Sequence, residues 1–182
     1  MSHVRENADS EWVRALVETY AGPLTRYAHS ITGDHESARD CVQETFIRLC
    51  SQARADLERH VAPWLFRVCR NRALDQQRKE ARMKPLNDES LAATATQEEA
   101  PLMALERRDA ARVITEHMRK LPDRQREVIR LKFQNELSYK EIAEVMEISV
   151  SNVGFVLHTA IKNLRQTLAS QTDLLAEPEI SQ

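Results

Sequence analysis

Glycine, aromatic residues and cysteine are all scarce in this chain of 182 residues. It contains three Gly, and aromatic side chains make up 5% of the sequence, a composition that favours helices. No apolar run approaches membrane-spanning length, and the first residues lack the apolar core of a signal peptide. We therefore expect an all-α protein that resides in the cytoplasm and does not insert directly into a membrane.

The chain also lacks the usual marks of a metal site or an active site. Its cysteines, Cys41, Cys50 and Cys69, have no CxxC spacing and lie beside apolar residues, which predicts buried small hydrophobic side chains rather than a redox or zinc site. The six histidines are scattered, without ligand spacing. No nucleophile–base pair and no glycine-rich phosphate loop is visible. The sequence therefore indicates no enzyme, no cofactor and no small-molecule substrate.

Apolar residues recur at helical spacing from about residue 10 to residue 83. We expect breaks in this pattern at Gly22-Pro23, at Gly33-Asp34 and around 60–63. Asp34 is a natural N-cap for the helix that follows it. That helix carries the apolar residues Ala38, Val42, Phe46 and Leu49.

The helical pattern fails between residues 84 and 104, where proline and acidic residues gather. A second helical block begins near Leu105, and its first helix carries the apolar residues Val113, Ile114, Met118 and Leu121. The sequence thus predicts two small helical domains, at 1–83 and 105–182, joined by an acidic flexible linker at 84–104.

Residues 138–158 read as two helices joined by a tight turn, which is the pattern of a helix-turn-helix. Ser138 and Glu141 have the spacing of a capping box at the start of the first helix. Apolar stripes on the two helices would face each other and leave the outer face of the second helix free for a DNA major groove. Any short helical corner would show the same stripes, so the motif alone leaves DNA binding and plain packing equally open.

Charge is distributed unevenly along the chain. The net charge is −2, whereas independent DNA-binding proteins are usually basic. Residues 67–84 nevertheless hold seven basic side chains against two acids. This run is either a solvated helix face or, with Trp64 and Phe66 beside it, a surface for unpaired bases. Either the basic charge is concentrated locally, or DNA binding depends on a larger partner.

Three motifs, in order, resemble those of one family, the extracytoplasmic-function (ECF) group of bacterial sigma factors. Residues 36–49 resemble the helix by which that family grips the largest polymerase subunit. Residues 62–75 resemble the segment that melts and reads the minus-10 element. Residues 121–128 and 137–143 resemble the helix-turn-helix domain that reads the minus-35 element.

The resemblance implies a function, partners and roles for individual residues. The chain would bind core RNA polymerase and promoter DNA, with an anti-sigma factor as a further partner. The polymerase-binding residues would be Asp40, Gln43, Glu44, Phe46 and Arg48. The residues lining the melted strand would be Trp64, Arg67, Arg70, Asn71 and Arg72, although Trp64 also reads as a core residue.

The helix-turn-helix departs from the family pattern in two places. Glu147 stands where the family turn carries Gly, which costs about 1 kcal/mol in a left-handed turn. The reading helix has few basic residues. What remains for reading the minus-35 element is Ser151, Asn152, Phe155, Val156, Thr159 and Lys162. Phe155 and Val156 would form an apolar outer face, which meets either DNA or a regulatory protein.

Two further interpretations compete with a sigma factor. A self-sufficient helix-turn-helix repressor or activator would need a dimerising segment and a more basic reading helix, and neither is visible. A structural interaction module would explain the apolar outer face but not the aromatic and basic segment near Trp64.

Overall fold

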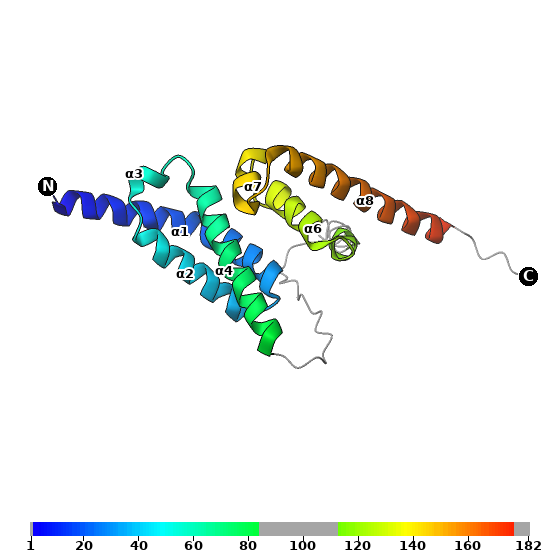
Figure 1. The fold of residues 1–182 in the computed structure, drawn as a ribbon, viewed down its shortest axis with the longest axis horizontal. Coiled ribbons are helices and arrows are strands. Elements are labelled where there is room, and N and C mark those ends of the chain that lie inside the picture. Colours follow the sequence, from blue (N-terminus) through cyan, green and yellow to red (C-terminus); the bar gives the residue numbers. More distant parts are fainter. Residues whose placement is uncertain (1, 84–112, 177–182) are drawn as a thin grey trace, which may run out of the picture. The chain divides into compact units, whose positions relative to one another are not determined.

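The computed structural model describes residues 2–83 and 113–176, and it describes side chains at 9–83 and 113–169. The chain forms two units, and each is all helical over the residues described, as the sequence predicts (Figure 1). The predicted linker at 84–104 and the predicted start of the second block near Leu105 lie outside the described residues. Within the described part, no helix is long and apolar enough to cross a membrane.

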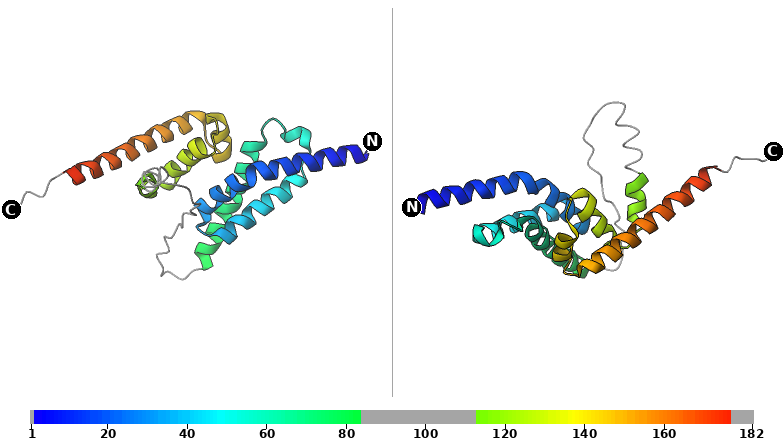
Figure 2. Two further views of the ribbon diagram at one scale, coloured as in Figure 1. Left: turned by 180° about the vertical axis from the view of Figure 1, so that it is seen from behind. Right: turned by 90° about the horizontal axis from the view of Figure 1, so that it is seen from above.

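Over residues 2–83, the first unit is built from four helices. They are α1 (Ser2–Thr32), α2 (His35–Cys50), the short α3 (Arg54–Leu57) and α4 (Val61–Met83). α1, α2 and α4 pack against one another, and the views in Figures 1 and 2 agree that they lie side by side. The exposed residues of α2, among them Asp40, Gln43 and Ile47, lie outside this packing.

The predicted break at Gly22-Pro23 is wrong, because α1 runs through both residues to Thr32. A proline inside a helix removes one hydrogen bond and costs about 3 kcal/mol. Leu16 lies before Pro23, and Leu24 and Tyr27 follow it, and all three side chains are buried. Burial of these side chains on both sides of the proline outweighs the local preference for a break.

The predicted boundary at Gly33-Asp34 is confirmed. α1 ends at Thr32, and Gly33 has a φ of 76°, a left-handed conformation that glycine adopts without strain. Asp34 caps α2, since its carboxylate accepts a hydrogen bond of 2.7 Å from the backbone N–H of Ser37. That hydrogen bond also lowers the pKa of Asp34 below its ordinary value.

The core of the first unit joins α1, α2 and α4. Tyr27 and Phe66 meet edge to face, with ring centroids 5.3 Å apart. Cys41 and Cys69 are buried as predicted, and burial raises the pKa of the Cys69 thiol to about 12. Cys50 is exposed at the end of α2. The prediction that all three cysteines are buried is therefore wrong for Cys50.

Among the described residues, the second unit starts with a helical segment at 113–119. α6 (Asp123–Ile129), the π-helix η1 (Arg130–Gln134), α7 (Tyr139–Met146) and α8 (Val150–Ala176) follow. η1 continues α6 directly and closes with a hydrogen bond of 3.2 Å from the N–H of Asn135 to the carbonyl of Arg130. α6 packs against α8, and both are visible in Figure 2.

The predicted helix-turn-helix is present, with α7 and α8 joined by residues 147–149. Ser138 and Glu141 form the predicted capping box. The N–H of Ser138 donates to the Glu141 carboxylate at 2.7 Å, and the N–H of Glu141 donates to the Ser138 hydroxyl at 3.3 Å. Glu147 adopts a φ of 55°, so the turn keeps its left-handed form with a residue other than glycine.

In the helical segment at 113–119, the buried residues differ from those that the apolar pattern predicts. Met118 is buried, whereas Val113 and Ile114 are 42% and 47% exposed. His117 is 2% exposed instead, and its Nδ1 lies 2.7 Å from the carbonyl oxygen of Val113. A histidine satisfied by its own helix can take a core position, and hydrophobic periodicity does not reveal such a residue.

Candidate functional site

The exposed face of α2 contains most of the residues predicted to bind polymerase. Asp40, Gln43 and Arg48 are exposed. Ile47 lies among them and is 60% exposed. Ile47 was not among the residues predicted from the sequence, although it follows Gln43 by four residues and so lies on the same helical face. This face combines an apolar residue with polar and charged neighbours.

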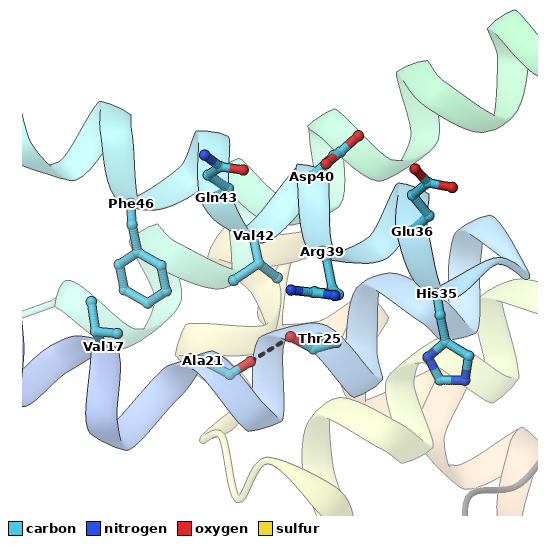
Figure 3. Close-up of a pocket in the computed structure, with 10 residues that line it drawn as sticks. All are labelled: Val17, Ala21, Thr25, His35, Glu36, Arg39, Asp40, Val42, Gln43 and Phe46. Carbon is cyan, nitrogen blue, oxygen red and sulfur yellow. Dashed lines mark hydrogen bonds between the residues drawn. The ribbon is translucent and has the colours of Figure 1, made fainter.

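Phe46 occupies a different position, at the seam between α1 and α2. Its ring is half-buried and points toward Val17 of α1, whereas Asp40 and Gln43 point away from α1 (Figure 3). A shallow groove runs along this seam. The residues lining the groove are Val17, Ala21, Thr25, His35, Glu36, Arg39, Asp40, Val42, Gln43 and Phe46.

Glu44 and Arg72 were predicted to serve different partners, but they bind each other. Arg72 Nη2 on α4 lies 2.6 Å from Glu44 Oε1 on α2, and the two side chains are 35% and 40% exposed. Arg72 Nε is buried and has no hydrogen-bond partner among the residues described. The ion pair links the helix predicted to contact polymerase with the helix predicted to contact DNA.

The other residues predicted to line the melted strand lie along the first half of α4. Trp64, Arg67 and Asn71 are spaced by three and four residues and share one helical face. Asn71 is exposed, and Trp64, Arg67 and Arg70 are half-buried. The structure thus groups an aromatic ring, a guanidinium and an amide on one face of α4.

α8 presents one exposed stripe of side chains. Ser151, Phe155, His158 and Lys162 are all exposed and follow one another by three or four residues. His158 was not among the residues predicted from the sequence, although its spacing from Phe155 places it on this stripe. Asn152 and Thr159 flank the stripe and are half-exposed.

Val156 does not belong to this stripe. Its side chain is 9% exposed, whereas that of Phe155 is 72% exposed. The expectation of an apolar outer face formed by both residues is therefore wrong for Val156. Adjacent helical residues lie about 100° apart around the axis, so Val156 turns inward when Phe155 faces solvent.

Two protein-family models match the chain, each over a separate set of helices. The family model described as Sigma-70 region 2 matches residues 16–83, which cover most of α1 and all of α2 to α4. The model described as Sigma-70, region 4 matches residues 111–164, which include the helix-turn-helix.

Curated relatives match over nearly their whole length. The chain is 33% identical over 153 residues to the ECF RNA polymerase sigma factor SigM of Bacillus subtilis, covering 82% of this chain and 91% of that protein. It is 32% identical over 166 residues to the ECF RNA polymerase sigma factor SigL of Mycobacterium tuberculosis, covering 88% of this chain and 91% of that protein.

Solved structures share the fold. The sigma factor RpoE, in a co-crystal with the anti-sigma factor NepR from Bartonella quintana, matches with a TM-score of 0.66 and 22% identity, covering 87% of this chain and 97% of that one. CnrH, in complex with the cytosolic domain of CnrY, matches with a TM-score of 0.60 and 24% identity, covering 88% of this chain and 90% of that one. With the two family matches and the curated relatives, these findings show that the chain belongs to the ECF group of the sigma-70 family of RNA polymerase sigma factors.

Proposed function

We propose that this chain is a dissociable, non-enzymatic subunit of RNA polymerase that acts inside the cell and uses different helices for the polymerase and for the promoter. As a sigma factor it binds core RNA polymerase and directs promoter-specific transcription initiation. The observation that carries the proposal is the ordered match of both sigma regions, at 16–83 and 111–164. We assign polymerase binding and the minus-10 element to residues 1–83, and the minus-35 element to residues 105–182, with a linker at 84–104.

The polymerase-binding surface in this proposal is the exposed face of α2. Asp40, Gln43 and Arg48 form a polar rim, and Ile47 is the exposed apolar residue inside it. Protein interfaces commonly combine a buried apolar anchor with a polar rim. Phe46 supports this face from the seam with α1 and lines the groove beside it.

The surface for melted promoter DNA in this proposal is the face of α4 with Trp64, Arg67 and Asn71, together with Arg70. Aromatic rings stack on unpaired bases, and guanidinium groups bind phosphates, which are the two contributions that single-strand binding requires. The neighbouring acid Asp75 is left out of this surface, because its carboxylate lies 3.2 Å from Arg78 Nη1 in an exposed ion pair.

The minus-35 element is assigned to the exposed stripe of α8. Ser151, Asn152 and Thr159 offer hydrogen-bonding groups, and Lys162 offers a positive charge for phosphate. An asparagine pairs well with adenine, and an apolar side chain such as Phe155 contacts the thymine methyl group. We therefore expect a site that contains A·T pairs.

An anti-sigma factor is the further partner that we propose. The sigma factor RpoE, which shares the fold of this chain, is solved with the anti-sigma factor NepR. In the free chain, Ile47 and Phe155 expose apolar surface, which a protein partner would remove from water.

The test is to measure the affinity of the folded chain for core RNA polymerase. Asp40→Arg reverses a charge on the exposed face of α2 and should weaken binding at least about tenfold, because like-charge contacts at an interface cost several kcal/mol. Circular dichroism checks that the variant keeps its helicity. Unchanged affinity in the folded variant would remove this face from the proposal. A chain that bound promoter DNA specifically but never bound polymerase would favour a repressor.

A further inference from the structure

The half of α8 that contains most of the proposed base-reading side chains has a single side chain able to carry a charge. Residues 150–161 contain no Asp, Glu, Lys or Arg, and His158 is the one histidine among them. The exposed cations of α8, Lys162 and Arg165, both follow this half. Any positive charge that a side chain of this half presents to DNA therefore comes from the imidazole of His158.

The position of His158 suits a contact with the DNA backbone. It follows Phe155 by three residues and precedes Lys162 by four, and all three side chains are exposed on the same stripe. Its ring makes no hydrogen bond or ion pair with any other residue that the structure describes. The hydroxyl of the adjacent Thr159 is engaged, since it donates to the carbonyl of Phe155 at 2.9 Å. The imidazole of His158 therefore keeps both ring nitrogens for a partner outside the chain.

The elements beside α8 carry charged groups, but within the described part of the chain none of their carboxylates pairs with His158. α6 lies on another side of α8, where the amide of Asn163 donates to Gln125 Oε1 at 2.9 Å. Asn163 lies about 140° around the helix from His158. On the side of α7, a Cβ added at Gly154, one turn before His158, would lie 3.8 Å from the ring of Tyr139. The charged and titratable groups of these neighbours are Glu116, His117 and Arg119 at 113–119, Asp123, Arg124, Arg126 and Glu127 on α6, Arg130 and Lys132 on η1, and Tyr139, Lys140, Glu141, Glu144 and Glu147 on α7. A proton on His158 therefore has no counterion from these carboxylates, and a DNA phosphate can supply one.

We propose that His158 binds a backbone phosphate at the minus-35 element, and that its protonation makes the affinity for DNA depend on pH. The inference rests on the proposed function and adds regulation to the same surface of α8. Histidine changes its charge between pH 5 and 8. The protonated ring donates a charge-assisted hydrogen bond to phosphate, whereas the neutral ring brings no charge. Because DNA favours the protonated form, the affinity is highest at the acidic end of this range and falls as the pH rises.

The test measures the affinity of the full chain for duplex DNA at pH 5 and at pH 8. The probe is a fluorescent duplex that carries the minus-35 element of a mapped start site, and fluorescence anisotropy reports binding. The wild-type chain should bind about fivefold more tightly at pH 5, which is the effect of one exposed charge pair. The slope of log affinity against log salt should be steeper at pH 5 by about 0.9, because one more phosphate is neutralised.

Two substitutions at His158 separate its proton from other effects of pH. His158→Gln keeps a hydrogen-bonding side chain that does not titrate, so its affinity should change less than about twofold between the two pH values. His158→Lys carries a fixed charge, so at pH 8 it should bind about as tightly as the wild type does at pH 5, with the steeper salt slope. His60→Gln is the matched control, because it removes an exposed histidine of the first unit and should keep the pH dependence. Circular dichroism at each pH checks the folding of every variant.

Equal affinity of the wild-type chain at both pH values would overturn the proposal. An equal pH dependence in His158→Gln would also overturn it, because another group would then titrate. If the chain unfolds at pH 5, the comparison at pH 8 decides, and a His158→Lys variant with the affinity and salt slope of the wild type counts against the proposal.

A shuffled duplex of the same composition distinguishes these outcomes from failure of the proposed function. A wild-type chain that prefers the minus-35 duplex but shows no effect of His158 refutes the role of His158 alone. A wild-type chain that binds both duplexes equally at either pH does not read the minus-35 element through α8, and both proposals for this surface then fail.

Discussion

Glu147 shows how a single residue carries backbone strain in the helix-turn-helix. It has a φ of 55° between α7 and α8, and its side chain is exposed. A left-handed conformation costs an ordinary L-residue about 1 kcal/mol, whereas glycine adopts it freely. The surrounding helices therefore impose a conformation that the residue itself disfavours.

Replacing Glu147 by glycine should stabilise the second unit. We expect Glu147→Gly to raise its free energy of unfolding by about 0.5 kcal/mol, since relief of strain outweighs the greater entropy of glycine in the unfolded chain. Calorimetric unfolding measures the change. Arg165→Gly, at an exposed position inside α8, is the control and should destabilise by up to about 1 kcal/mol. Equal losses in both variants would contradict the strain at Glu147.

Phe155 and Val156 are neighbours with opposite environments, and their truncations should differ accordingly. Val156→Ala should destabilise the second unit by about 2 kcal/mol, because it leaves a cavity. Phe155→Ala should change stability by less than about 0.5 kcal/mol and should weaken binding to minus-35 DNA. Thermal unfolding and DNA titration of the same two variants test this, and the reverse pattern would mean that the stripe on α8 is wrongly placed.

At the scale of the element, α2 depends on the cap at its first turn. The hydrogen bond from the N–H of Ser37 holds the pKa of Asp34 below its ordinary value of 3.8. A carboxyl group whose pKa is lower in the folded state stabilises the fold at every pH above its unfolded pKa. That contribution is lost as the pH falls through the folded pKa.

The cap should therefore make the free energy of unfolding depend on pH. We expect Asp34→Ala to be less stable than the wild type at pH 7, and we expect the difference to shrink as the pH falls below 3.8. Urea unfolding at several pH values measures this difference in stability. The fluorescence of Trp12 and Trp64 reports the unfolding. Asp34→Asn can still cap without titrating and is the matched control. A difference that stays constant down to low pH would mean that the carboxylate charge does not matter.

α8, the helix proposed to read the minus-35 element, presents few cations, and we expect its affinity for DNA to depend weakly on salt. Each phosphate neutralised contributes about −0.9 to the slope of log affinity against log salt. For the full chain on minus-35 duplex DNA, Lys162→Ala should make that slope shallower by about 0.9. Lys120→Ala removes an exposed cation outside the helix-turn-helix and should not change it. An equal effect of both variants would indicate nonspecific attraction.

For the whole molecule, the sequence was sufficient wherever short-range chemistry decides the structure. The cap at Asp34 and the capping box at Ser138 depend on residues three positions apart, and both are confirmed. Pro23, His117 and Val156 depend on packing against distant helices, which local preferences do not contain. The pairing of Glu44 with Arg72 spans 28 residues and needed coordinates. The predicted contacts with polymerase and DNA stay predictions.

Charge gives the whole molecule its dependence on a partner. The chain has 26 basic and 28 acidic residues, and its net charge is −2. Phosphate neutralisation is the main source of affinity for DNA. A chain with a net negative charge gains little affinity in this way. The charge balance therefore favours docking on polymerase before DNA binding, and the proposed attachment surface is the exposed face of α2.

In vitro transcription with mapped 5′ ends tests this account most directly. Core RNA polymerase is combined with genomic DNA from the source organism and with either the wild-type chain or Asp40→Arg. The account predicts that the wild-type chain produces defined start sites that share two upstream sequence elements, and that Asp40→Arg produces almost none. Absence of new start sites with the folded wild-type chain, or identical start sites with both chains, would contradict it.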